Sequence, residues 1–388
     1  MPRITMVGVT APSHVLPGLP VIEELVRRGH DVTYVVGDRL RDLVAPTGAR
    51  VLTHPSILPN PQSPGGEVWP DDIIAAQRLF LDEQIAVLPH VLDDGPADLY
   101  LYDIGGYAGK VAARHAGVPA VQLSPTFVAW EGYEEDMAAF TAEREQLPGF
   151  TAYRERFDGW IAPYGFAPDG DAFASRPEHA VALIPKVMQP NADRVRESIR
   201  FVGTVFGPAA AQGWTPPGDG RPILYIAFGT AYHADAAFHR RCVEAFAGDW
   251  HVVISAGEGG DLDGIGPVPD SVELHRWVPQ VAVLEHADVF ITHAGMGSAG
   301  QGLWCGTPMV AIPQAVEQFQ NADSLVGLGV ARRLDMEDAT AGALREAVTA
   351  VHESRAVAER AAALRDEVRA GGGTSGAADA IEALLPAA

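Results

Sequence analysis

Short apolar runs rich in β-branched and aromatic residues alternate, along the first half of the chain, with segments in which apolar residues recur every three or four positions. The runs predict strands, and the periodic segments predict amphipathic helices. The predicted strands are residues 4–9, 31–37, 98–103 and 119–124, and the predicted helices are residues 19–28, with Gly29 as a C-terminal cap, and 107–116. This alternation is typical of a mostly parallel sheet covered by helices.

The same alternation begins again in the second half of the chain. Strands are predicted at residues 223–230, 251–257, 272–277, 289–293 and 309–314, and helical segments at 337–364 and 375–385. Residues 207–222, GPAAAQGWTPPGDGRP, have the composition of an interdomain linker. The predicted fold class is therefore α/β, with two doubly wound Rossmann-like domains that face a cleft. The expected ranges are 1–208 for the N-terminal domain, 209–222 for the linker, 223–370 for the C-terminal domain, and 371–388 for a C-terminal helix that packs back on the N-terminal domain.

Two stretches interrupt the alternation in the first half. Residues 54–72 are rich in proline and glycine and predict a long loop. Residues 127–178 are aromatic, acidic and interrupted by prolines, which predicts short helices and loops inserted beside the sheet. Long insertions of this kind commonly serve binding.

Composition narrows the class of protein. The 388 residues suffice for two domains, and a hydrophobic content of 47% suffices for large buried cores. No apolar run has the length of a membrane span, and the N-terminus lacks the form of a signal peptide. Two cysteines cannot form a disulfide framework, and a net charge of −22 leaves no basic footprint for nucleic acid. We expect a cytoplasmic protein that binds neither membrane nor nucleic acid; its oligomeric state does not follow from the sequence.

Two residues with acid–base chemistry follow predicted strands of the first domain. His14 comes after the first strand, and Asp103 ends the strand at 98–103. A histidine is a natural base for a hydroxyl, and a carboxylate on its second ring nitrogen would orient it and stabilise the imidazolium. The alternatives are an exposed turn histidine and a helix N-cap aspartate. No serine or cysteine elbow motif accompanies the two residues, so a covalent mechanism is not indicated.

The stretch HAGMGSAGQG, residues 293–302, joins a predicted strand to a helix and contains G-x-G-x-x-G. Glycines allow close approach of a ligand, and the N–H groups at a helix start favour an anion. His293 and Ser298 would add side-chain donors around Gly295 and Gly297. The motif by itself also fits an NAD(P)-dependent oxidoreductase, or a tight turn with no ligand.

Residues before and after this loop suggest which groups a ligand would have besides an anion. Trp277 ends a predicted strand and could stack on a base whose edge the backbone of Val278 reads, although a core tryptophan is the plainer interpretation. Glu317 and Gln318 follow the strand at 309–314, and a carboxylate beside an amide makes a pair that binds hydroxyls. Alone, that pair would be interpreted as surface loop residues.

The combined pattern RWVPQ, HAGMGSAGQG and GTPMVAIPQAVEQFQNA resembles the sugar-nucleotide signature of family 1 glycosyltransferases with the GT-B fold, and in particular bacterial macrolide glycosyltransferases of the oleandomycin-inactivating type. The segment SHVLPGLPVIEELVRRGHDVTYVV is similar to the GHVNP region of that family. The resemblance implies that His14 is the catalytic base and Asp103 its orienting carboxylate. It implies donor contacts by Thr230, Trp277, Val278, Gln280, His293, Gly295, Gly297, Ser298, Gln301, Glu317 and Gln318.

The chain departs from the family pattern in two places. Gln301 stands where many members have a glutamate that contacts the ribose hydroxyls, and an amide lacks the charge-assisted strength of a carboxylate. SHVLP replaces GHVNP beside the base. The first departure leaves the choice between UDP and TDP open.

The resulting hypothesis is an inverting, metal-independent transfer of a sugar, with UDP-glucose as the expected donor, to a hydroxyl of a hydrophobic natural product such as a macrolide or polyphenol. UDP-sugar is a co-substrate, and no cofactor or metal is expected. The aromatic insertion is expected to bind the acceptor through Phe127, Trp130, Tyr133, Met137 and Phe140, whose plainer interpretation is helix packing. The alternatives are a TDP-deoxysugar transferase of antibiotic biosynthesis, an NAD(P)-dependent oxidoreductase, a UDP-sugar epimerase and a non-catalytic helper protein.

Overall fold

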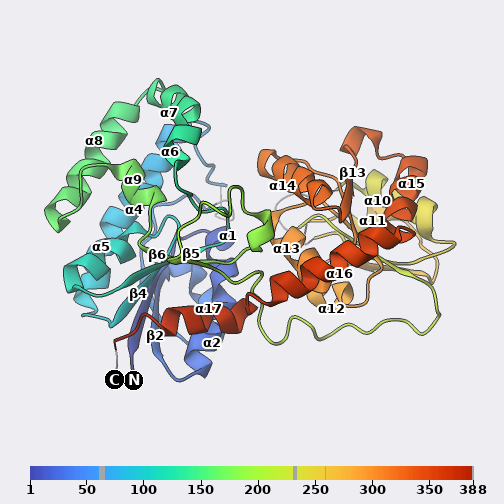
Figure 1. Ribbon diagram of the computed structural model, residues 1–388, viewed down its shortest axis with the longest axis horizontal. Helices are drawn as coiled ribbons and strands as arrows, with labels where there is room; N and C mark the ends of the chain where they lie inside the picture. Colours follow the sequence, from blue (N-terminus) through green and yellow to red (C-terminus); the bar gives the residue numbers. More distant parts are fainter. Residues whose placement is uncertain (61–65, 230–233, 258, 387–388) are drawn as a thin grey trace. The chain divides into compact units, whose positions relative to one another are not determined.

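The structure is a computed structural model that describes residues 1–60, 66–229, 234–257 and 259–386. The chain divides into two compact units (Figure 1). Unit 1 comprises Met1–Leu183, Gln189–Phe201 and Gly373–Ala388, and unit 2 comprises Ile184–Met188 and Val202–Gly372. These boundaries differ from the expected ranges, because residues 184–188 and 202–208 belong to unit 2.

Unit 1 is built on a parallel sheet, and its described residues form the strand order β3-β2-β1-β4-β5-β6-β7. The strands are β1 (Arg3–Val7), β2 (Asp31–Gly37), β3 (Arg50–His54), β4 (Leu99–Asp103), β5 (Ala120–Ser124), β6 (His179–Ala182) and β7 (Ile199–Phe201). The α-helices are α1 (Pro12–Val15), α2 (Leu19–Arg27), α3 (Arg41–Val44), α4 (Ile73–Asp93), α5 (Tyr107–Ala116), α6 (Tyr133–Asp136), α7 (Ala138–Glu145), α8 (Phe150–Ile161), α9 (Gly170–Ser175) and α17 (Gly373–Glu382). Short 3₁₀ helices are η1 (Leu16–Gly18), η2 (Asp38–Leu40), η3 (Ala45–Thr47) and η4 (Ala162–Tyr164).

Unit 2 contains a second parallel sheet, with the strand order β10-β9-β8-β11-β12-β13 in its described residues. Its strands are β8 (Ile223–Ala227), β9 (His251–Ser255), β10 (Val272–His275), β11 (Val289–Thr292), β12 (Met309–Ala311) and β13 (Ala331–Arg333). Its helices are η5 (Lys186–Met188), α10 (Ala236–Phe246), α11 (Leu262–Ile265), α12 (Gln280–Leu284), α13 (Met296–Cys305), α14 (Val316–Gly327), η6 (Met336–Asp338), α15 (Ala341–His352) and α16 (Arg355–Arg369). The predicted α/β class with two parallel sheets is confirmed.

Alternate residues of strand β8 point to opposite faces of the unit 2 sheet, as strand geometry requires. Tyr225 packs in the cluster that includes Leu303 of α13 and Leu364 of α16. Its neighbour Leu224 packs in the other cluster, with residues of α10 and α15. Because helices cover both faces, central strands such as β8 and β11 are wholly apolar or nearly so, and this explains why they were recognisable in the sequence.

The C-terminal helix α17 packs against α2 within unit 1 (Figure 1). Arg28, at the end of α2, pairs with Asp379 at 2.6 Å and with Glu382 at 2.7 Å. His30 Nε2 lies 2.7 Å from a carboxylate oxygen of Glu382. Charged contacts therefore hold the end of the chain on the unit that contains its beginning.

The order of the strands brings distant parts of the sequence to one sheet edge. In unit 1 the order reverses between β1 and β4, where Val7 is level with Tyr102. In unit 2 it reverses between β8 and β11, where Ala227 is level with Thr292. Ligands of open α/β sheets bind at the carboxyl ends of strands at such switch points. His14 and His293 each follow a strand at one of them.

Several elements are not indicated by the sequence pattern. They are the strands β3, β6, β7 and β13 and the long helix α4. The last two strands span only three residues each, and α4 has apolar residues around most of its surface and Pro89 near its end, so periodicity is weak in all of them. The helical segment predicted at 337–364 is divided, because Ser354 caps a new helix, α16, through the N–H of Val357.

Candidate active site

His14 and Asp103 meet at the switch point of the unit 1 sheet. His14 Nδ1 lies 2.8 Å from Asp103 Oδ1, which also accepts a hydrogen bond from the N–H of Gly105 at 2.9 Å. Since the carboxylate can only accept, Nδ1 carries the proton and Nε2 keeps its lone pair. Burial lowers the pKa of His14, but the hydrogen bond to Asp103 and the charge of Asp103 outweigh it, so the pKa is raised above 6.5. The geometry is that of an oriented general base.

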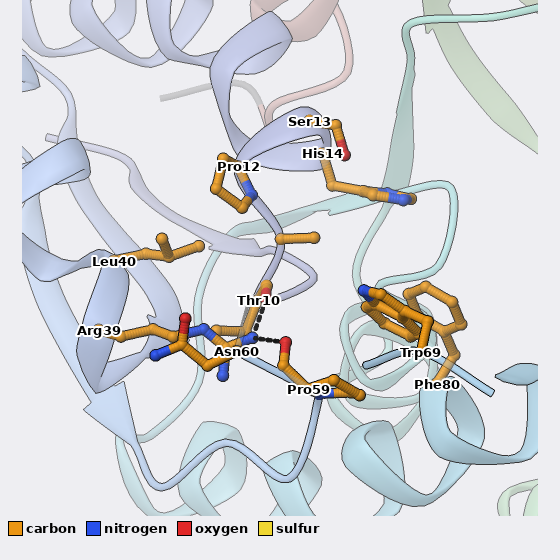
Figure 2. A pocket seen from close by; sticks show the side chains of 11 residues that line it. Thr10, Pro12, Ser13, His14, Arg39, Leu40, Pro59, Asn60, Trp69 and Phe80 are labelled. Atoms are coloured by element: carbon orange, nitrogen blue, oxygen red, sulfur yellow. Dashed lines mark hydrogen bonds between the residues drawn. The ribbon is translucent and has the colours of Figure 1, made fainter. Parts of the chain in front are cut away.

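A cavity of about 520 Å³ opens beside this histidine within unit 1 (Figure 2). Figure 2 shows Trp69 and Phe80 on one side of the cavity and Arg39 and Leu40 on the other. The rings of Trp69 and Phe80 stack with centroids 5.1 Å apart, and the Phe80 ring lies 5.8 Å from that of His14. The volume lies in the range of small-molecule sites. The cavity therefore places an aromatic wall next to the base.

The five residues expected to bind the acceptor are not among the residues that line the His14 cavity within the described chain. Tyr133, Met137 and Phe140 line a separate cavity of about 600 Å³ beside α7 and α9. Trp130 lines a third cavity, and its indole donates to Asp136 at 2.6 Å. Phe127 is half-buried. The aromatic wall at the base comes instead from Trp69, inside the predicted loop at 54–72, and from Phe80 on α4.

The glycine-rich loop surrounds the imidazole of His293, which is only 8% exposed. A Cβ at Gly229 or at Gly295 would stand under 3.0 Å from this ring, so both positions require glycine for the ring to lie where it does. Burial lowers the pKa of His293 to about 4, against a smaller opposing effect of the Ala227 backbone. The imidazole is therefore neutral at pH 7 and carries a single N–H, for which the backbone of Ala227 is one acceptor.

Ala294 connects His293 to helix α13 with φ of 60°, the left-handed region that a residue with a Cβ rarely adopts. The amide of Asn321, on α14, donates to the Ala294 carbonyl at 3.0 Å and supports this turn. Helix α13 then begins at Met296 without an acidic residue in its first turn, so its first N–H groups can receive an anion. Gly297 and Ser298 lie in that turn. Thr230, which was predicted to contact phosphate, lies outside the described residues.

Unit 2 has a cavity of about 340 Å³, which is lined by residues that include Trp277, Val278, Gln280 and Gln301. Trp277 is 66% exposed and so is not a core tryptophan. Gln280 Nε2 donates to Gln301 Oε1 at 2.7 Å and lies 3.3 Å from Ser298 Oγ. The two amides thus form one unit, in which the side-chain oxygen of Gln301 already has a donor.

The two residues of the predicted hydroxyl-binding pair differ in their exposure and in their hydrogen bonds. Glu317 is exposed in the first turn of α14. Gln318 is buried, and its Oε1 accepts from the N–H groups of Gln314 at 2.8 Å and Ala315 at 3.2 Å. The oxygen of Gln318 therefore caps the start of α14 and leaves only its NH₂ group for a ligand.

Sequence reasoning missed Trp69, Phe80, Arg39 and Asn321. Trp69 could have been found as an aromatic residue within a long loop, but the other three carry no local signal, because their roles depend on contacts across the fold. Among the described residues, no cluster of three or more histidine, cysteine or acidic side chains could hold a metal ion. No helix in those residues is long and apolar enough to cross a membrane.

Each unit has a parallel sheet. One unit holds a histidine hydrogen-bonded to a carboxylate, and the other holds a glycine-rich loop at a helix start and an exposed tryptophan. These features together are those of GT-B glycosyltransferases. Residues 243–384 match the family described as erythromycin biosynthesis protein CIII-like, C-terminal domain. The chain is 45% identical to oleandomycin glycosyltransferase of Streptomyces antibioticus, over 99% of this chain and 91% of that protein. It is 32% identical to an NDP-glycosyltransferase of Bacillus licheniformis, over 99% and 98%.

The fold matches the crystal structure of the glycosyltransferase of kitacinnamycin with a TM-score of 0.88 and 41% identity, over 100% of both chains. The protein belongs to the family 1 glycosyltransferases with the GT-B fold. The relatives named here are all glycosyltransferases, and none of them is described as an oxidoreductase or an epimerase.

Proposed function

We propose that this glycosyltransferase transfers glucose from UDP-glucose, with inversion and without a metal ion, to a hydroxyl group of a hydrophobic natural product. The observation that carries the proposal is the His14–Asp103 pair, with Nδ1 and Oδ1 2.8 Å apart, at the mouth of a cavity with an aromatic wall. A macrolide or a polyphenol is the expected acceptor, and the relatives include an oleandomycin glycosyltransferase and the glycosyltransferase of kitacinnamycin.

In the proposed reaction His14 Nε2 takes the proton of the acceptor hydroxyl while that oxygen attacks the anomeric carbon of the donor sugar. The bond from this carbon to the diphosphate oxygen breaks on the opposite face, and UDP leaves with the bonding electrons. Asp103 stabilises the imidazolium that forms. One base on one side of the sugar accounts for inversion, because no covalent intermediate is needed.

The diphosphate is proposed to bind at the start of α13. The helix N-terminus and the neutral N–H of His293 would stabilise the charge that develops on the leaving group. Trp277 would stack on uracil, with the backbone of Val278 and the Gln280–Gln301 pair beside the base and ribose. Glu317 and the NH₂ group of Gln318 would hold sugar hydroxyls.

The proposal is tested by incubating the protein with UDP-glucose and a panel of macrolides and polyphenols, in the presence of EDTA. The expected product carries one hexose, and the anomeric coupling constant in its proton NMR spectrum reports a β-glycoside. A His14→Ala variant should lose about two to four orders of magnitude in kcat, while UDP affinity measured by calorimetry stays close to that of the wild type. An α-glycoside product, or full transfer by the variant, contradicts the mechanism.

A TDP-sugar is the second candidate donor, and the contact between Gln280 and Gln301 favours testing it. The proposed ribose site would have two neutral amides, and the side-chain oxygen of Gln301 accepts a hydrogen bond from Gln280. A neutral amide pair forms a weaker hydrogen bond with a ribose 2′-hydroxyl than a carboxylate would, so the donor loses less affinity when that hydroxyl is absent. Comparing kcat/KM for UDP-glucose and TDP-glucose decides between the two donors, and a Gln301→Glu variant should shift that ratio toward UDP-glucose.

A further inference from the structure

One wall of the His14 cavity is a short loop, residues 55–60, that is held from two sides. Its members Pro59 and Asn60 line the cavity, and Figure 2 shows them across from Ser13 and His14. Arg39, in η2, donates to the carbonyl oxygens of Leu58 at 2.9 Å and Pro59 at 3.3 Å. The same guanidinium donates to the carbonyl oxygen of Thr10 at 2.6 Å, so it ties the loop to the segment that leads to His14.

Glu83, on α4, holds the other side of this loop. Its Oε2 accepts from the N–H of Ile57 at 2.8 Å, and its Oε1 accepts from the hydroxyl of Ser56 at 2.9 Å. Ser56 Oγ in turn accepts from Arg39 at 3.4 Å and from the N–H of Leu58 at 3.2 Å. Within the described residues the two charged groups form no direct ion pair. One serine hydroxyl connects them.

The carboxylate of Glu83 is buried, and its two hydrogen bonds come from neutral groups of the loop. The residue is 1% exposed, and Leu81, Val87 and Leu88 of the same helix are also buried. Burying a carboxylate against neutral donors alone costs more free energy than burying an apolar side chain of similar size. Stability therefore does not explain a glutamate at this position, whereas fixing the loop does.

We propose that Glu83 is a positioning residue for the acceptor: through Ser56 and Ile57 it holds residues 55–60 in place, and it thereby sets the affinity of the His14 cavity for its ligand. The proposal rests on the proposed function only in naming that ligand as the sugar acceptor. Glu83 touches neither reacting group. Its removal should act on acceptor binding and leave the chemical step and the donor site in unit 2 unchanged.

A Glu83→Gln variant tests this role at nearly constant size. If the amide oxygen turns to Ile57, the NH₂ group faces Ser56 Oγ, which already receives hydrogen bonds from Arg39 and Leu58. If the oxygen turns to Ser56, the NH₂ group opposes the N–H of Ile57. In the first orientation the NH₂ group competes with Arg39 and Leu58 for Ser56 Oγ, and in the second two donors face each other in a buried site. The loop should therefore loosen although the side chain keeps its shape.

The experiment uses umbelliferone, a fluorescent planar phenol, as the probe. Glu83→Gln should raise the acceptor KM and the dissociation constant of the probe about tenfold, with donor KM and kcat at saturating acceptor within twofold of the wild type. Asp82→Asn is the matched control, because Asp82 is the preceding residue of α4 and pairs with Arg156 on the surface. It should leave both acceptor constants unchanged.

Ser56 provides a second, independent variant if Glu83→Gln fails to fold. Ser56→Ala removes the connecting hydroxyl and should lower the affinity for the probe, as Glu83→Gln does. Ser56→Thr keeps the hydroxyl and should bind the probe as the wild type does. The double variant Glu83→Gln/Ser56→Ala should bind the probe no more weakly than Glu83→Gln alone, because both substitutions break the same connected set of hydrogen bonds.

The outcomes separate this proposal from the proposed function. If the wild type binds the probe but transfers no sugar, and Glu83→Gln still weakens binding, the catalytic function fails and the positioning role stands. If the wild type transfers sugar and both Glu83→Gln and Ser56→Ala keep its acceptor constants, the positioning role is overturned. A rise in donor KM equal to that in acceptor KM also overturns it, since a general loss of structure would explain both.

Discussion

The imidazole Nδ1 of His14 lies 2.8 Å from Oδ1 of Asp103, although the two residues are 89 positions apart in the chain. The contact joins a one-turn helix after β1 to the last residue of β4. It orients the base and raises its pKa, and both effects can be measured separately.

The first prediction concerns the pH dependence that this pair produces. The base acts when it is unprotonated, so the acid limb of kcat/KM in the wild type should have its midpoint above pH 6.5. In Asp103→Asn the raising effects disappear and burial still lowers the pKa, so the midpoint should move below 6.5 while the plateau falls by about two orders of magnitude or more. A pH–rate profile with an aliphatic alcohol acceptor, whose own ionisation does not interfere, measures both. An unmoved midpoint would show that Asp103 does not control His14.

The second prediction concerns the exposed face of Trp277. Because 66% of this residue is accessible, Trp277→Ala should change the free energy of unfolding little. Loss of stacking on a base should raise the donor KM by about one to two orders of magnitude, with acceptor KM unchanged. Steady-state kinetics with both substrates varied gives the two constants, and urea unfolding gives the stability. An unchanged donor KM would remove Trp277 from the donor site.

The third prediction concerns the glycine next to His293. A Cβ at position 295 would collide with the His293 ring, so Gly295→Ala should displace the imidazole and weaken UDP binding about tenfold or more. Gly342→Ala, on α15, is a matched control because its Cβ would meet open space. Calorimetric titration with UDP compares the two variants. Equal affinity in both would show that the position of His293 does not matter for the diphosphate.

The fourth prediction concerns stability in acid. Burial lowers the pKa values of His239 and His293 to about 4, below the value of 6.5 that applies to the unfolded chain. Between these values only the unfolded state takes up the protons, so stability is lost as the pH falls from 6.5 toward 4. The free energy of unfolding should decrease by about 1–2 kcal/mol for each group between pH 7 and pH 5, partly offset by His14, whose raised pKa acts in the opposite direction. Urea unfolding at both values measures the slope, and His239→Gln should reduce it.

Much of the fold was predictable because its signals are local. Strands β4 and β8 are nearly continuous apolar runs, and α5 carries a clear helical period, so their positions follow from neighbouring residues alone. Strands β7 and β13 were not predictable, because three residues with charged members carry no period. Their pairing with the edge of a sheet makes them strands, and pairing is a tertiary property.

The candidate site likewise has features that the sequence indicates and contacts that only the folded chain shows. His14, Asp103 and the loop at 293–302 could be named as candidates because each lies at or after the end of a predicted strand, and the chemistry of a residue at a strand end can be inferred from its type. The exact contacts were not recognisable. The side-chain oxygens of Gln318 and Gln301 accept hydrogen bonds from neighbours that only the folded chain supplies, so they have less capacity to accept from a ligand than the residue types alone indicate.

The sequence by itself determined two α/β domains, and it placed His14, Asp103 and the glycine loop at the ends of strands. These features depend on residue type and on spacings of a few residues. The backbone geometry of strands and helices turns such spacings directly into the direction in which each side chain points. The contact between His14 and Asp103 was expected from the sequence, and the structure contains it. Only the tertiary structure decided that Trp69 and Phe80 form the wall beside His14. It also decided that Arg39 and Glu83 hold one loop through Ser56. Such contacts depend on the order of strands in the sheet and on the packing of α4 against it, and neither is encoded in any short stretch of the chain.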